Sequence, residues 1–255
     1  MDFNKEILNY IKPEYIDECK ARMGASFKVY PSKTKIGFLV LGINPAGDEK
    51  DTIFEKQDNY FYLNFIEGFK KNKYTSPVYF KQVYVLAEKV FDKVKWDWCN
   101  LSSKELEHYL DINDFSLNEK DKIRKHFIGH KDNFVTIYIG DLFYIHETSQ
   151  NILLKWIKTK DISDYVKRCL DEHISLIKNA GVEELIIYVN NAKASEYINN
   201  AISDGKPKSK TPYKSCKIFF GSMISGQRAM DVFSKERLIH EIRSNAKEVN
   251  KRTIA

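Results

Sequence analysis

Polar side chains stand at the ends of two short apolar runs in this sequence, and their types suit hydrolytic chemistry. Asn44 follows the run 35–42, Asp141 lies at the end of the run 134–142, and Asp48 comes shortly after Asn44. An asparagine amide can hold a water molecule by hydrogen bonds, and an ionised carboxylate accepts hydrogen bonds from amino or hydroxyl groups. Together these groups could hold a polar ligand or a water molecule by hydrogen bonds.

The elements that position these side chains alternate between strands and helices. Nearly unbroken apolar runs predict buried strands at 35–42, 134–142, 184–190 and 216–222. Helices are predicted at 2–22 with a break near Pro13, at 77–91, in pieces over 92–133, and at 161–180, 192–203 and 228–249. This alternation predicts an α/β fold: a single domain with a four-stranded parallel sheet and helices on both faces. Ligands of such sheets bind outside the carboxyl ends of the strands, so we expect the site at that edge.

Composition and charge narrow the class of protein. The chain has 255 residues, of which 43% are hydrophobic and 13% aromatic, as expected for a globular protein. A net charge of +6 is compatible with a polyanionic partner. Four widely spaced cysteines without a CxxC pair argue against a metal site and against a disulfide framework. The sequence shows neither a signal peptide nor an apolar run of membrane-spanning length, so we expect a cytoplasmic protein.

Three segments together resemble a known family. The turn after the first predicted strand reads GINP at 42–45, an aromatic cluster reads NYFY at 59–62, and SMISGQR follows the last strand at 222–228. This set resembles the uracil-DNA glycosylase superfamily, most closely its mismatch-specific uracil and thymine branch, whose first motif reads Gly-Ile-Asn-Pro-Gly. The resemblance implies a glycosylase-like α/β domain over 35–249, preceded by a helical extension over 1–34.

The resemblance also implies roles for individual residues. Asn44 would position the water that attacks the sugar C1′ of a flipped-out nucleotide, with Asp48 as a possible helper. Such cleavage passes through an oxocarbenium-like state, so water positioning and charge stabilisation do much of the work. The residues expected to bind or stack on the base are Ile43, Phe54, Asn59, Asp141 and His146. An ionised Asp141 would suit an amino group, as on cytosine, or a hydroxyl, as on a sugar-decorated base.

The segment 222–228 departs from the family pattern, because its arginine is in register but the proline and histidine of related loops are missing. In the family this loop presses on the DNA backbone and fills the gap that the flipped nucleotide leaves. The basic loop at 203–215 would add salt-sensitive affinity for phosphates. The implied DNA contacts are Ser222, Ser225, Gly226, Gln227, Arg228, Lys208 and Lys210.

The resemblance therefore implies a monomeric, monofunctional DNA glycosylase that needs no metal or cofactor and removes a non-canonical, modified or mismatched pyrimidine. Uracil is the default base, and a hypermodified phage cytosine is the other candidate, so the role would be base-excision DNA repair or antiviral defence. Two other functions stay open: a catalytically silent DNA-binding or regulatory module on the same scaffold, and a nucleotide or nucleoside N-glycosidase. Purely structural roles also stay open, with Asn44 bonding its own turn, Phe54 in the core and Ser225 capping the last helix.

Overall fold

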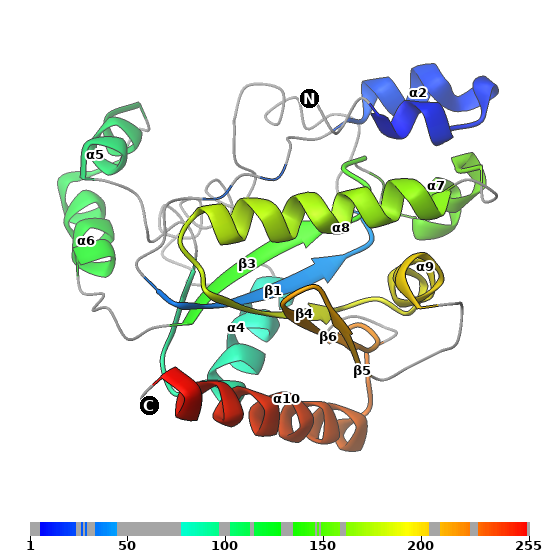
Figure 1. Ribbon diagram of the computed structural model, residues 1–255. Helices are drawn as coiled ribbons and strands as arrows, with labels where there is room; N and C mark the ends of the chain where they lie inside the picture. Colours follow the sequence, from blue (N-terminus) through cyan, green and yellow to red (C-terminus); the bar gives the residue numbers. More distant parts are fainter. Residues whose placement is uncertain are drawn as a thin grey trace.

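The strands that the apolar runs predict lie side by side in one sheet, with helices on both faces (Figure 1). The computed structural model describes residues 6–23, 27, 29, 34–44, 78–96, 103–112, 115–128, 135–145, 147, 149–158, 162–203, 210–224 and 229–253. In order across the sheet, the strands are β2 (Val94–Trp96), β3 (Val135–Asp141), β1 (Ile36–Gly42), β4 (Glu184–Val189), β6 (Cys216–Phe220) and β5 (Lys210–Tyr213).

The four central strands, β3, β1, β4 and β6, run parallel, as the sequence predicts. The sheet as a whole has six strands and is mixed, because β5 pairs antiparallel with β6 at one edge and β2 adds a parallel strand at the other. The prediction of a four-stranded parallel sheet is therefore wrong at both edges. Both edge strands are short, and Lys95 in β2 and Pro212 in β5 obscure the strand pattern. Proline is tolerated in β5 because an edge strand has one side outside the ladder.

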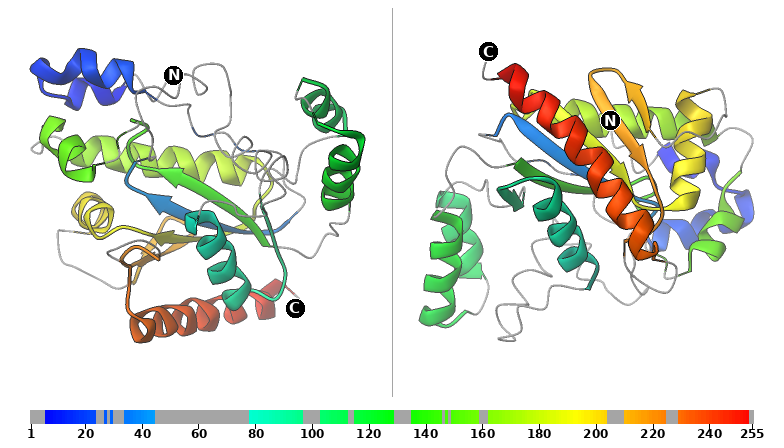
Figure 2. Two further views of the ribbon diagram at one scale, coloured as in Figure 1. Left: turned by 180° about the vertical axis from the view of Figure 1, so that it is seen from behind. Right: turned by 90° about the horizontal axis from the view of Figure 1, so that it is seen from below.

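Helices form a layer on each face of the sheet (Figures 1 and 2). One layer holds α7 (Gln150–Trp156), α8 (Ile162–Asn179) and α9 (Ala192–Ile202), the other holds α4 (Val78–Val90) and α10 (Val232–Thr253), and α5 (Ser103–Ile112) and α6 (Leu117–Ile128) stand apart from both. The predicted stop of α8 is confirmed, because Gly181 has a φ of 106°, which a helix-terminating glycine adopts easily. No helix among the described residues is both long and apolar enough to cross a membrane.

Strand β1 contributes alternate side chains to two separate cores. Leu39 and Leu41 pack with residues of α7, α8 and α9, whereas Phe38 and Val40 pack with residues of α4 and α10. All four side chains are fully buried. Because both faces of the strand are covered, the run is continuously apolar and does not alternate with polar residues.

The amino-terminal segment is less helical than its pattern predicts. It forms the 3-10 turns η1 (Ile7–Tyr10) and η2 (Pro13–Tyr15), followed by the short α2 (Ile16–Ala21). Ile7, Ile11 and Cys19 are nevertheless buried in the same core as α8. Backbone hydrogen bonds of 2.8 Å also run from Lys12 N to Trp156 O and from Lys158 N to Tyr10 O. The segment is therefore part of the main core and not an appendage to it.

Candidate functional site

Asn44 lies just past the carboxyl end of β1, and its side-chain amide is held in one orientation. Its Nδ2 donates to the carbonyl oxygen of Glu147 over 2.8 Å and faces that of Ile145 at 3.4 Å. A flipped amide would bring its own oxygen against these two carbonyl oxygens, so the observed orientation is the favourable one. Oδ1 then lies on the opposite side of the amide, away from these two carbonyl oxygens.

The segment that Asn44 contacts is anchored by a buried ion pair. Glu147 Oε2 accepts from Arg22 Nη1 over 2.8 Å, and the two side chains are only 4% and 12% exposed. Glu147 Oε1 accepts from the backbone N–H of Ser149 over 2.9 Å. The guanidinium of Arg22 also lies 5.4 Å from the ring centroid of Trp156. The amino-terminal segment therefore helps to fix the surface on which Asn44 rests.

Asp141 ends β3 directly beside Gly42, its register partner at the end of β1. A Cβ atom added to Gly42 would lie 2.3 Å from Asp141 Oδ1, so the carboxylate occupies space that any other residue at position 42 would fill. No hydrogen bond or ion pair joins this carboxylate to a residue in the described part of the chain. Burial raises the pKa of the Asp141 carboxyl from 3.8 to about 7.

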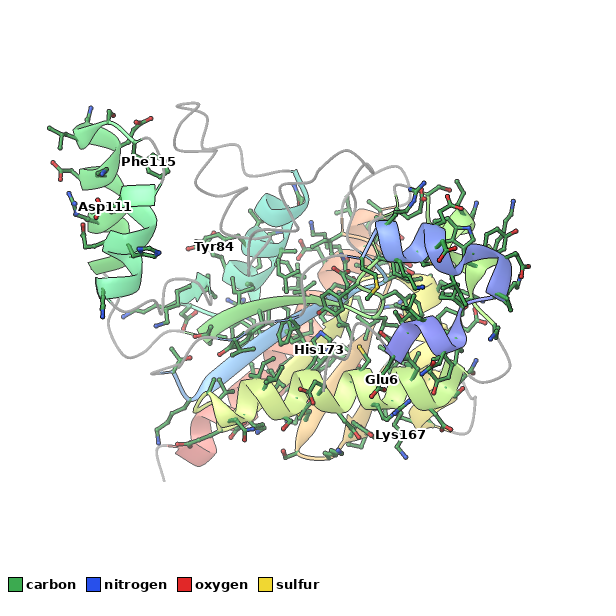
Figure 3. All side chains as sticks on the ribbon, turned by 90° about the horizontal axis from the view of Figure 1, so that it is seen from above. Glu6, Tyr84, Asp111, Phe115, Lys167 and His173 are labelled. Carbon is green, nitrogen blue, oxygen red and sulfur yellow. The ribbon has the colours of Figure 1, made fainter. Side chains whose placement is uncertain are left out.

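A buried chain of hydrogen bonds leads from the backbone of Asp141 to α8. The Asp141 N–H donates to Tyr144 Oη over 3.2 Å, and Tyr144 Oη lies 2.7 Å from His173 Nε2. His173 Nδ1 lies 2.7 Å from the carbonyl oxygen of Cys169. Because a carbonyl only accepts, Nδ1 carries the proton, and Nε2 accepts from the tyrosine hydroxyl. Burial lowers the pKa of His173 from 6.5 to about 4, so the ring is neutral. Figure 3 labels His173, which lies on α8.

The close fit of His173 depends on a second glycine. A Cβ atom on Gly140 would lie 2.5 Å from His173 Nε2. The imidazole also contacts the ring of Phe27, with centroids 4.3 Å apart, and stacks on Tyr144, with centroids 5.9 Å apart. The sequence analysis did not identify Tyr144 or His173. The adjacent Gly140 and Asp141 at a strand end are the signal that could have led to them.

Polar side chains at the other strand ends serve the fold. Asn190, after β4, accepts from the backbone N–H of Ile224 over 2.9 Å. Asn191 caps α9 by accepting from two backbone N–H groups, and its Nδ2 donates to Gln150 Oε1 over 2.9 Å. Asp141 therefore differs from these neighbours, because its carboxylate has no partner among the residues described.

Two of the predicted DNA contacts, Ser222 and Lys210, lie among the described residues. Ser222 follows β6, and its carbonyl oxygen accepts from the hydroxyl of Tyr188. Lys210 lies on β5, where its Nζ donates to Asn245 Oδ1 of α10 over 3.3 Å. Lys210 is thus part of an edge strand and not of a basic loop, since the predicted loop 203–215 contains β5.

The remaining predicted residues divide into one that is buried and several that are not described. Ile43 is 6% exposed and packs in the core beside α8, so its side chain has little surface to offer a base. The predicted residues that lie outside the described part of the chain are Asp48, Phe54, Asn59, His146, Lys208, Ser225, Gly226, Gln227 and Arg228.

Two further observations bear on the chemistry of this site. Among the described residues, no group of three or more histidine, cysteine, aspartate or glutamate side chains could hold a metal ion. No protein-family model matches the chain, and a search of curated proteins found no match either.

Proposed function

We propose that this protein is a DNA glycosylase that hydrolyses the N-glycosidic bond of a non-canonical, modified or mismatched pyrimidine. The observation that carries the proposal is the pairing of two strand ends. Asn44 follows β1 with its amide fixed, and Asp141 ends the adjacent β3 with its carboxylate without a partner among the described residues. The parallel arrangement of β3, β1, β4 and β6 supports the glycosylase-like fold that the resemblance implies.

In this proposal Asn44 Oδ1 holds the attacking water. The water oxygen forms a bond to the sugar C1′ as the bond from C1′ to the base nitrogen breaks, and the electron pair of that bond leaves with the base. The proton that the water loses is released to the solvent, from which the departing base takes up a proton. An oxocarbenium-like state of this kind needs a well-placed water more than a strong base. The two hydrogen bonds from Nδ2 favour the proposal, because they keep Oδ1 from rotating away.

Asp141 would contact the edge of the base. With a pKa of about 7, its carboxyl group exists in both protonation states at neutral pH. The ionised form accepts from an exocyclic amino group, and the protonated form donates to a carbonyl oxygen. An ionised Asp141 suits modified cytosine, and its protonated form also suits uracil, the default base of the resemblance.

The test is a strand-cleavage assay on labelled duplexes. The substrates carry uracil, thymine opposite guanine, or the modified cytosines of phage DNA, and alkali converts abasic sites to breaks. We expect breaks on one substrate with the wild-type protein and none with Asn44→Ala. Asn179→Ala, an exposed amide at the end of α8, is the matched control and should cleave normally.

The same preparation separates the other two functions. Intact DNA with retained duplex binding would replace the proposal with a silent DNA-binding module. Release of free base from nucleotides or nucleosides, with every duplex intact, would replace it with a nucleotide or nucleoside N-glycosidase.

A further inference from the structure

Several hydrogen-bond donors lie close to Asp141, but each is committed to another acceptor. The Asp141 N–H donates to Tyr144 Oη over 3.2 Å, and the Leu142 N–H donates to Gly42 O over 3.2 Å. The thiol of Cys169 donates to Leu142 O over 3.4 Å. Each of these three donors is therefore engaged with an acceptor other than the Asp141 carboxylate.

The Asp141 N–H is the most important of these donors, since an aspartate carboxylate readily accepts from nearby backbone N–H groups. The N–H of Leu142 points to β1, so that of Asp141 points to the opposite side, where β2 would continue. However, β2 ends at Trp96, opposite Ile137, so no residue of this strand pairs with Asp141. The Tyr144 hydroxyl accepts from the Asp141 N–H instead.

His173 fixes the direction of that hydroxyl. Its Nε2 accepts the hydroxyl proton, so a lone pair of the tyrosine oxygen is left to face the Asp141 N–H. The imidazole cannot turn freely, because its Nδ1–H donates to Cys169 O, while Phe27 and the bare backbone of Gly140 lie against the ring.

We infer that Tyr144 and His173 are positioning residues that hold the Asp141 N–H away from the Asp141 carboxylate and so keep that carboxylate available to a ligand. The described titratable groups that face Asp141 are Tyr144 on its own segment and Cys169 and His173 on α8. Across the sheet, Gly42 on β1 brings no charge. The inference does not depend on the proposed function; only the identification of the ligand as a DNA base does.

The test follows Asp141 by NMR in the full-length protein. The pH midpoint of its Cγ signal and the shift of its amide proton are recorded in the wild type, in Tyr144→Phe and in Tyr165→Phe. Tyr165 is the matched control, since its buried hydroxyl donates to Leu142 O over 3.1 Å, one residue from Asp141. Tyr144→Phe should lower the midpoint by about one pH unit, a tenfold stronger acid, because the freed N–H turns to the carboxylate. Tyr165→Phe should leave the midpoint unchanged.

The amide proton of the wild type gives a second reading that needs no variant. It should scarcely move as the carboxylate ionises, whereas in Tyr144→Phe it should shift downfield with the same midpoint as Cγ. Equal midpoints in the wild type and Tyr144→Phe would overturn the inference, and so would a wild-type amide proton that follows the carboxylate. A lowered midpoint in a protein that releases no base from any substrate would support the inference and refute the proposed function.

Discussion

Replacing Asp141 by asparagine should change how the stability of the protein depends on pH. Burial raises the pKa of the Asp141 carboxyl from 3.8 to about 7 in the folded chain. Between these two values the folded protein keeps a proton that the unfolded chain has lost. The free energy of unfolding therefore falls as the pH rises through this window and levels off above the folded-state pKa.

The size of the effect follows from the width of this window. Each pH unit within it lowers the stability by about 1.4 kcal/mol, which gives about 4 kcal/mol for the whole window. Asp141 is partly exposed at the strand end, so solvent reduces this penalty. We expect a loss of roughly 2 kcal/mol between about pH 5 and about pH 8. Asparagine has nearly the same shape and does not titrate, so the variant should lack this loss.

Urea unfolding, followed by circular dichroism at a series of pH values, measures the difference. The stability of Asp141→Asn relative to the wild type should rise by roughly 2 kcal/mol from about pH 5 to about pH 8. Asp92→Asn, at an exposed position after α4, controls for the general loss of one negative charge and should show no such trend. If the curves for Asp141→Asn and the wild type run parallel over this range, Asp141 is an ordinary solvated carboxylate, and the reasoning about the site fails.

Two further substitutions test how the site is held. Gly42→Ala should move the Asp141 carboxylate toward solvent and so lower the NMR midpoint of Asp141 Cγ. The cost in stability should be small, because the Asp141 side chain can give way. An unchanged midpoint would contradict the distance of 2.3 Å between a Cβ atom at position 42 and Asp141 Oδ1. Arg22→Met leaves the Glu147 carboxylate buried without its guanidinium and should cost about 3 kcal/mol in urea unfolding. Adding Glu147→Gln to Arg22→Met should restore part of the lost free energy of unfolding. If instead the costs of the two single substitutions simply add in the double variant, the two side chains are not coupled.

The strands at the centre of the sheet could be predicted because both of their faces are buried. That burial favours the nearly unbroken apolar runs of β1, β3, β4 and β6. The edge strands could not be predicted in the same way. β2 has three residues and β5 has four, and each becomes a strand only because a neighbour offers an unpaired edge. The amino-terminal pattern predicts a longer helix than forms, since Ile7 and Ile11 enter the main core from 3-10 turns and extended chain.

The placement of the candidate site could be predicted only in part. Parallel strands bring their carboxyl ends to one edge, so Asn44 and Asp141 could be placed near each other from the sequence. The state of the Asp141 carboxylate could not, because it depends on His173, which is 29 positions away from Tyr144 in the sequence. A single histidine on the apolar face of a predicted helix carries no sign of its partner. The predicted loop 203–215 is wrong at Lys210, which belongs to β5. Proline and lysine in this segment hide the strand pattern.

The two glycines at these strand ends have the same explanation. Neither Gly42 nor Gly140 has a positive φ, so neither is required by backbone conformation. Each leaves room for a group that occupies the place of its missing side chain: the carboxylate of Asp141 in one case and the imidazole of His173 in the other. Gly42 therefore makes room for the Asp141 carboxylate, and Gly140 makes room for the His173 ring that orients the Tyr144 hydroxyl. A substitution at Gly42 should displace the Asp141 carboxylate directly, whereas one at Gly140 should act through His173 and Tyr144. The end of β1 and the end of β3 are thus coupled through Asp141, although they are far apart in the sequence.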